Sequence, residues 1–350
     1  MYYKIASLAE TGKKIILHYF NYNNRSISSL QKYCYQVHSY NRLKGFKALS
    51  FTKPYIVSSR MNNELIQRLN KDDHPVLLEG LHCTGILPFL NKNKKTVIRI
   101  HNNESVYYAH LANTEKNLLK HFYYLWEAKV LKKYQEALQK KLPLACLSEL
   151  DLESFKDEGF QSLHFIPCFT PWQRIKIKKG KGAYCLYHGN MEVAENEAAA
   201  KWLIENVFNA INTSFIISGN GISNRLMAYA KEHSHIQFIN NPSIEQLNNL
   251  VSDAHINILP SMNQTGVKLK LLHALAEGRF CITNQNGLAG SKIITGITSA
   301  ETPSSWISHI KKMMMEEFDD FLIEERTGIF ALYNNQKNAE KLNELLKHYQ

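Results

Sequence analysis

Short apolar stretches alternate with amphipathic segments along most of this chain, and this alternation constrains the fold more than any other feature. Brief runs of apolar and β-branched residues favour buried strands, whereas apolar residues three and four apart favour helices. Strands that alternate with helices predict an α/β protein with a largely parallel sheet. In the first half we expect strands at residues 15–20, 55–58, 76–81, 96–100 and 144–148, and helices at 61–69 and 107–141.

A second set of alternating elements follows the prolines at positions 167 and 171. The stretch 167–171 and the basic run 176–181 predict an interdomain linker, because proline continues neither a helix nor a sheet. A chain of 350 residues with 44% hydrophobic content is long and apolar enough for two cores. We therefore expect two α/β domains, the second with strands at 183–188, 214–218, 235–239, 256–259 and 280–283.

The beginning of the chain departs from the usual pattern of a doubly wound domain. Residues 2–10 have helical spacing, Gly12 fits a helix C-cap, and the first strand is expected only at residue 15. Such a domain ordinarily opens with a strand. The first domain is therefore expected to start partway through its first βαβ unit, with its first strand missing.

Targeting segments and metal-binding cysteine pairs are absent from the sequence. Residues 1–14 hold no apolar core followed by a small-residue cleavage site, and no apolar run approaches 18 residues. The six cysteines stand singly, without the paired spacing of a zinc site or a redox dithiol. We expect a cytoplasmic protein without a metal site, in which Cys83, Cys146, Cys185 and Cys281 are reduced core residues.

The net charge of +11 is concentrated in the first half of the chain. Residues 1–170 contain 24 Lys and Arg against 14 Asp and Glu, whereas residues 171–350 contain 18 against 17. Such an excess attracts an anionic partner, unless it is only a solvated basic face. The segment 115–141 interleaves seven lysines with the aromatic run 122–126, which fits either a helix with apolar residues inward or a basic aromatic surface.

The most informative stretch is residues 255–278, which reads as a buried strand, a polar loop and a helix. Ligands of open α/β sheets bind beyond the carboxyl ends of the strands, and a new helix offers free N–H groups to a phosphate there. Gly266 allows close backbone approach. Lys268 is expected in the first turn, Lys270 just after it, and His273 on the same face as Lys270. The pattern indicates an anion site, or else a solvated helix start.

Residues 265–279, TGVKLKLLHALAEGR, resemble the donor-binding signature of GT-B glycosyltransferases related to family 4, TGxxLKxLEAxAxGxP. The resemblance implies that Thr265, Gly266, Lys268 and Lys270 hold the diphosphate of a nucleotide sugar. His273 stands where the family has the glutamate that binds the ribose, and a histidine can also hydrogen-bond a ribose hydroxyl. The second family glutamate, eight residues earlier, is Thr265 here.

Two other loops of the second half are similar to the family's glycine loops. Gly189 and Asn190 follow the strand at 183–188, and Gly219 and Asn220 follow the strand at 214–218. Tight turns favour such residues in any protein. Together with the loop that contains Gly266 and Lys268, they imply a donor site at one sheet edge.

In the first half, His101 ends the strand at 96–100 and resembles the family residue that faces the transferred sugar. The alternative is a strand-end histidine bonded to backbone. The resemblance makes His101 and Lys270 the catalytic candidates, with positive groups stabilising the departing diphosphate. The acceptor side is assigned to His82, Arg99 and Glu104.

The resemblance implies a GT-B architecture with two Rossmann-like doubly wound domains facing a cleft. The expected boundaries are 1–168 for the acceptor-side domain, 169–331 for the donor domain and 332–350 for a helix that crosses back. The expected reaction is transfer, with retention, from a UDP- or GDP-linked sugar to a glycan or lipid-linked acceptor in polysaccharide or glycoconjugate synthesis. No further cofactor is expected, and the basic first domain could rest on an anionic membrane.

Three alternatives stay open at this point. A sugar-nucleotide epimerase shares the fold but needs carboxylates around the sugar. A non-catalytic partner subunit fits the substitution at His273. A nucleic-acid binder fits the charge, but the sequence shows no recognition motif for one, so no nucleic-acid partner is expected.

Overall fold

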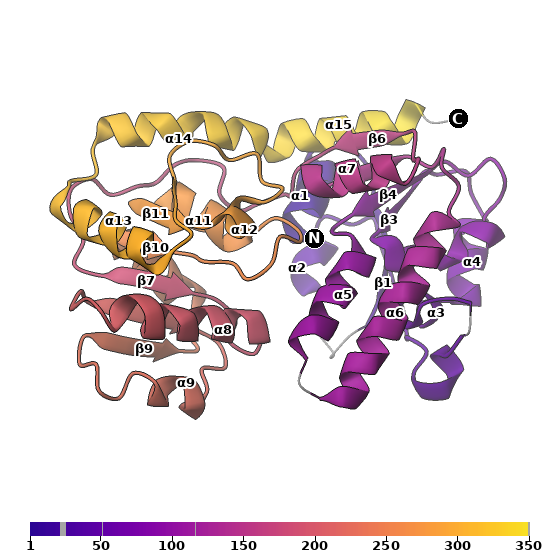
Figure 1. The fold of residues 1–350 in the computed structure, drawn as a ribbon. Coiled ribbons are helices and arrows are strands. Elements are labelled where there is room, and N and C mark those ends of the chain that lie inside the picture. The colour runs from indigo at the N-terminus through magenta and orange to yellow at the C-terminus, as the bar shows by residue number, and fades with distance from the viewer. Residues whose placement is uncertain (22–25, 51, 116, 349–350) are drawn as a thin grey trace. The chain divides into compact units, whose positions relative to one another are not determined.

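Three parallel sheets define the fold in the computed structural model, which describes residues 1–21, 26–50, 52–115 and 117–348 (Figure 1). Their strand orders are β1-β2, β3-β4-β5-β6 and β12-β11-β10-β7-β8-β9. Each pairing between these named strands is parallel. The expected α/β class with largely parallel sheets is therefore confirmed.

The chain divides into two compact units. The first unit comprises Met1–Pro171 together with Tyr333–Gln350, and the second comprises Trp172–Leu332. The β1-β2 and β3-β4-β5-β6 sheets belong to the first unit, and the six-stranded sheet belongs to the second.

The strands of the first unit are short and lie between helices. They are β1 (Ile16–Phe20), β2 (Gln36–Tyr40), β3 (Val76–Glu79), β4 (Thr96–Ile100), β5 (Leu144–Cys146) and β6 (Leu163–Phe165). The α-helices are α1 (Tyr2–Glu10), α2 (Ser28–Gln31), α3 (Tyr55–Ser58), α4 (Asn63–Leu69), α5 (Glu104–Thr114), α6 (Leu118–Glu136), α7 (Glu149–Asp157) and α15 (Asn335–His348), and the 3₁₀ helices are η1 (Gly45–Ala48) and η2 (Leu81–Phe89).

Two sequence predictions for the first unit were wrong. Residues 55–58 form helix α3 rather than a strand, because Pro54 starts a turn in which the Ser58 hydroxyl donates to the carbonyl of Pro54 at 3.1 Å. The predicted helix at 107–141 is two helices, α5 and α6, which pack side by side (Figure 1). The side chain of Asn117 caps the second of them by accepting from the Lys120 N–H.

The second unit surrounds the six-stranded sheet with helices. Its strands are β7 (Cys185–His188), β8 (Phe215–Gly219), β9 (Ile236–Asn240), β10 (Ile256–Ile258), β11 (Phe280–Thr283) and β12 (Thr298–Ser299). Its α-helices are α8 (Ala194–Leu203), α9 (Asn224–Ala228), α10 (Ile244–Asp253), α11 (Leu269–Glu277), α12 (Gln285–Leu288), α13 (Pro303–Met315) and α14 (Asp320–Leu332), and a π-helical turn, η3 (Ile204–Phe208), follows α8. The five strands expected here are all present.

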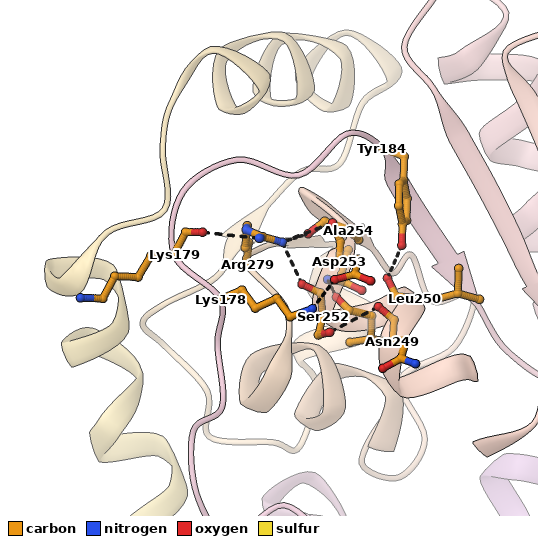
Figure 2. Close-up of polar contacts among 11 residues, drawn as sticks. Lys178, Lys179, Tyr184, Asn249, Leu250, Ser252, Asp253, Ala254 and Arg279 are labelled. Carbon is orange, nitrogen blue, oxygen red and sulfur yellow. Dashed lines mark hydrogen bonds and ion pairs between the residues drawn. The ribbon is translucent and has the colours of Figure 1, made fainter. Parts of the chain in front are cut away.

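Arg279, the last residue of the run 265–279, stabilises the fold through hydrogen bonds to backbone carbonyls (Figure 2). Its side chain is 6% exposed and lies at the carboxyl end of α10. One guanidinium nitrogen donates to three carbonyls, those of Ser252 at 2.8 Å, Asp253 at 3.2 Å and Ala254 at 3.1 Å. These carbonyls lack partners within a helix, so a cation stabilises them. Arg279 thereby fixes the segment that joins α11 to β11.

The cysteines are all free thiols, and Cys146, Cys168, Cys185 and Cys281 are buried while Cys34 and Cys83 are half-buried. None of the helices in the described part of the chain is both long enough and apolar enough to cross a bilayer.

Candidate donor site

Three loops of the second unit meet at one edge of the six-stranded sheet. They follow β7, β8 and β10, which are neighbours in the order β10-β7-β8 and are parallel. Because parallel strands end at the same edge, the loops at 189–192, 220–222 and 259–268 lie together there. The last of these, which contains Lys268, is called the lysine loop below. Open α/β sheets bind their ligands at this edge.

Gly189 and Gly219 bring the first two loops into direct contact. The Gly189 N–H donates to the carbonyl of Ser218 at 3.1 Å, and the Met191 N–H donates to the carbonyl of Asn220 at 2.7 Å. A Cβ atom on Gly219 would overlap the carbonyl oxygen of Gly189. Position 219 therefore requires glycine for close packing.

Asn190 orders the β7 loop, whereas Asn220 acts there through its backbone. The Asn190 side-chain oxygen accepts from the Glu192 N–H at 3.1 Å, and its carbonyl accepts from the Asn196 amide at 2.9 Å. Of these residues, Asn196 also contacts Lys270 of α11, as described below.

Asn263 organises the lysine loop, and the sequence reasoning missed it. Its side-chain oxygen accepts from the Thr265 N–H and the Thr265 hydroxyl, both at 3.1 Å, and from the Lys268 ammonium at 2.6 Å. Its amide nitrogen donates to the carboxylate of Glu195 at the start of α8. The only signal in the sequence was a polar residue in a loop, which many non-functional loops share.

The lysine loop leads into α11 at Lys268. Lys268 is the residue before the helix, not part of its first turn as predicted, and Lys270 is the second helical residue. Gly266 has φ of 65°, a left-handed conformation that favours glycine. The N-cap residue, Lys268, makes no side-chain capping hydrogen bond to α11. The backbone N–H groups of this turn can therefore serve an anion.

The Lys270 ammonium lies between the β7 strand and α8. It is 3.2 Å from both the Tyr187 hydroxyl and the side-chain oxygen of Asn196, and 4.6 Å from the centre of the Tyr187 ring. Burial and then the charge of Lys268 lower its pKa to about 7, although Glu195 opposes the shift. Its present partners are neutral, so an incoming anion would supply the charge that this site lacks.

His273 lies one turn further along α11, in an aromatic setting. Its ring is buried, stacks on Trp172 with centroids 4.6 Å apart, and has the His188 ring edge-on at 5.7 Å. Its Nε2 is 3.2 Å from the carboxylate of Glu277. Burial lowers the pKa of His273, and Glu277 opposes the shift. Glu277, for which no role was predicted, thus places a carboxylate one helical turn from position 273, where the resembled signature has a glutamate.

His188 ends β7 beside these groups. Its side chain is buried, and its Nε2 has no hydrogen-bond partner among the described residues. Burial, followed by the charges of His273 and Lys270, holds its pKa well below the usual range. A neutral imidazole with a free nitrogen can still exchange a hydrogen bond with a ligand.

A second polar cluster lies at the carboxyl ends of β3 and β4 in the first unit. His101 Nε2 is 3.1 Å from Glu79, and Glu79 also pairs with the buried Lys4 of α1. Burial alone would raise the pKa of Glu79, but Lys4 and His101 hold it well below its usual range. His101 therefore pairs with a carboxylate rather than with backbone. No role was predicted for Lys4.

The three residues predicted for the acceptor side do not all lie in this cluster. His82 Nδ1 is 3.9 Å from Glu104 in the first turn of α5, and its ring packs against Gly80. Burial opposes protonation of His82, but Cys83 and Glu104 raise its pKa overall. Arg99 is 2% exposed and donates to the carbonyl of Pro167 at 2.7 Å. It therefore fixes the segment that follows strand β6. An acceptor role for these residues stays a prediction.

Comparisons with known proteins bear on both units. A sequence profile described as "Glycosyl transferases group 1" matches residues 182–316. An uncharacterized 44.6 kDa protein in the cps region of Klebsiella pneumoniae is 28% identical over 75% of this chain and 71% of its own length.

Solved structures show the same fold at low sequence identity. Sucrose-phosphate synthase from Thermosynechococcus elongatus superposes with a TM-score of 0.67 and 13% identity, covering 98% of this chain and 91% of its own. HepE of Anabaena, determined in complex with UDP and glucose, gives 0.66 and 10%, covering 99% and 95%. TarM gives 0.59 and 16%, covering 80% of this chain but only 57% of its own.

The parallel sheets and these likenesses define the GT-B fold. The profile match shows that residues 182–316 are similar to the group 1 glycosyl transferases.

Proposed function

We propose that this chain transfers a sugar, with retention, from a UDP- or GDP-linked donor to a glycan or lipid-linked acceptor in cell-surface polysaccharide synthesis. One observation carries the proposal: the start of α11, Gly266 and two lysines converge at the sheet edge, and the two groups that accept from the Lys270 ammonium there, the Tyr187 hydroxyl and the Asn196 amide oxygen, are neutral. Such a place favours a diphosphate. The cps region named for the Klebsiella relative supports the polysaccharide context.

The residues would divide the work as follows. Lys268, Lys270 and the α11 backbone would hold the diphosphate and stabilise its charge as it departs. Gly189, Asn190, Gly219 and Asn220 would let the donor approach the sheet edge closely. His273, supported by Glu277, would bond the ribose in place of the family glutamate. His101 would contact the transferred sugar.

Nucleotide binding tests the donor half of this proposal. UDP, GDP and their sugars are added to the protein in a thermal unfolding experiment, with Lys270→Ala and the control Lys201→Ala, a half-buried lysine of α8, alongside. A nucleotide at about 100 times its Kd should stabilise the protein by about 2.7 kcal/mol. We expect the shift in the wild type and in Lys201→Ala and a much smaller one in Lys270→Ala. No shift with any nucleotide contradicts the donor site, and a shift without turnover favours a non-catalytic partner subunit.

A further part of the proposal concerns the first unit, which we propose rests on an anionic membrane through helix α6. Three apolar side chains at its start are exposed, Leu118 by 72%, Leu119 by 83% and Phe122 by 65%. These exposed side chains disagree with the alternative of a helix whose apolar residues all point inward. The exposed lysines on the same helix are Lys120, Lys129, Lys132 and Lys133. Apolar and cationic side chains on one helix suit an interface with anionic lipid.

Vesicle sedimentation tests the membrane contact. The wild type should sediment with vesicles that contain anionic lipid, more weakly with neutral vesicles, and more weakly at high salt, because screening weakens the attraction. The double variant Leu119→Asp, Phe122→Asp should lose about tenfold or more in binding, since it removes two inserted side chains. Phe46→Asp is the matched control, because Phe46 is 93% exposed elsewhere in the first unit. Equal losses in both variants would refute a specific role of α6.

A further inference from the structure

Two arginines of the first unit line one cavity and have no role in the chemistry proposed above. Arg42 lies just after strand β2, Arg60 lies just after helix α3, and both are half-buried. Both line the cavity of the first unit, together with His82 of η2. Charged side chains ordinarily extend into solvent, so two guanidinium groups that line a cavity call for a counterion.

Hydrogen bonds tie together the two segments that carry these arginines. The Leu43 N–H donates to the carbonyl of Ser59 at 2.9 Å, and Arg42 Nη2 donates to the Ser59 hydroxyl at 3.0 Å. Arg60 is the next residue, and its Nη1 donates to the carbonyl of Ile56, four residues earlier, at 2.6 Å. The two side chains are therefore anchored through neutral groups of adjoining segments.

The charge of Arg60 is not neutralised by a carboxylate within the described part of the chain. Arg60 forms no ion pair there, and its guanidinium has N–H groups beyond the one that Ile56 accepts. Burial and then the charge of Arg42 lower the pKa of Arg60, although Glu104 opposes the shift. Both guanidinium groups stay charged at neutral pH, so they repel each other. An anion that accepts from both removes this repulsion.

His82 adds a further donor beside Arg60. The residue after Arg60, Met61, packs against η2 so closely that a Cβ atom on Gly85 would lie 2.7 Å from the Met61 sulfur. This contact holds Arg60 next to η2, where His82 is the second residue. Burial and the charge of Arg60 oppose protonation of His82, but the neighbouring thiol and Glu104 raise its pKa overall. The imidazole can therefore donate to the same anion as the arginines.

We propose that Arg42 and Arg60, with His82, bind a phosphate group, and that the acceptor of the transfer reaction carries this phosphate. A phosphate offers three oxygens and about two negative charges, so it can accept from two guanidinium groups at once. A carboxylate has only two oxygens and one charge, which match a single guanidinium. The acceptor is then a phosphate-bearing molecule, either a sugar phosphate or a lipid-linked phosphate.

The surroundings of the site connect it with the acceptor. His101, which is assigned above to the transferred sugar, lines the same cavity. Glu79 also lines the cavity, but its carboxylate is already bound by Lys4 and His101 and does not compete for the arginines. The acceptor role rests on the function proposed above, whereas phosphate binding by the arginines does not depend on it.

Titration calorimetry with inorganic phosphate tests the site, with chloride at equal ionic strength as the control for screening. The wild type should bind phosphate, and Arg42→Gln and Arg60→Gln should each bind it about tenfold or more weakly, because a charged hydrogen-bond donor is lost. Arg60→Lys keeps the charge without the fork and should fall between them and the wild type. Arg68→Gln is the matched control, because Arg68 lines the same cavity but pairs with Glu64. It should bind phosphate like the wild type.

The Lys270→Ala variant separates this site from the donor site. Phosphate binding that survives in Lys270→Ala and is lost in Arg60→Gln belongs to the first unit, whether or not a nucleotide binds the second. Phosphate binding that is lost in Lys270→Ala and kept in Arg60→Gln would overturn the proposal. Acetate that binds the wild type as tightly as phosphate would overturn it as well, in favour of a carboxylate ligand.

Two further ligands test the acceptor role and distinguish its sources. A hexose phosphate and a short-chain prenyl diphosphate are titrated into the Lys270→Ala protein, with and without Arg60→Gln. We expect one of them to bind more tightly than inorganic phosphate and to lose that affinity with Arg60→Gln, and the tighter ligand identifies a sugar phosphate or a lipid-linked acceptor. If neither binds more tightly than inorganic phosphate, the acceptor role is wrong, even where nucleotides stabilise the protein as expected of the donor site.

Discussion

The Lys270→Met variant is expected to lose about 10²–10³-fold in kcat/KM for sugar transfer from the donor nucleotide, a loss typical of removing one group that stabilises developing charge. The ammonium of Lys270 lies at the start of α11, where the departing diphosphate would gain charge. Lys268 is a poor substitute, because its own ammonium donates to Asn263 and to the carbonyl of Thr265, both at 2.6 Å. Methionine keeps most of the stem that packs on Tyr187, so the fold should survive.

Initial rates of nucleotide release over a range of donor concentrations measure this effect. The loss should fall mainly on kcat if Lys270 acts on the transition state, and mainly on KM if it only binds the donor. Lys201→Met is the control, because Lys201 is a lysine of the same unit that pairs with Glu205 of the following turn η3. A kcat/KM of the Lys270→Met variant within threefold of the wild-type value would show that Lys270 does not belong to the site.

The local patterns predicted most strands, because a buried parallel strand is a short apolar run bounded by polar residues. Helix α1 and strand β4 have the predicted bounds. Strands β2 and β6 were not predicted, because β2 is half polar and β6 is only three residues long and half-buried. The Ile56-Val57 pair favoured a strand at 55–58, but Pro54 and the Ser58 hydroxyl stabilise a helical turn there.

The candidate site was predictable only where a residue type carries the chemistry by itself. Gly266 and the two lysines stood out because a left-handed backbone and a cation near a helix start have few other uses in combination. Asn263 did not, because its role depends on three donors that fold around one amide oxygen. Trp172 lies 101 positions before His273, and nothing local in the sequence indicates their stacking.

Donor affinity is expected to fall as the pH rises above about 7, by up to about tenfold per pH unit. In the free protein the pKa of Lys270 is about 7, because burial and Lys268 disfavour its charged form. A bound diphosphate favours that charged form, so it raises the pKa and the complex takes up a proton. Below pH 7 the lysine is already charged and no proton is taken up, whereas above pH 7 binding must first protonate it.

Titration calorimetry with a nucleotide sugar between about pH 6 and pH 8.5 measures this dependence, and buffers of different ionisation enthalpy count the proton. The pyrophosphate of a nucleotide sugar stays fully ionised over this range, so it does not contribute. Burial holds the pKa of His188 well below its usual range and lowers that of His273, and burial raises the pKa of Tyr187. Lys270→Arg should bind with little pH dependence, because a guanidinium stays charged. An affinity that is flat in the wild type, or that falls equally in Lys270→Arg, would show that Lys270 is not the group that meets the diphosphate.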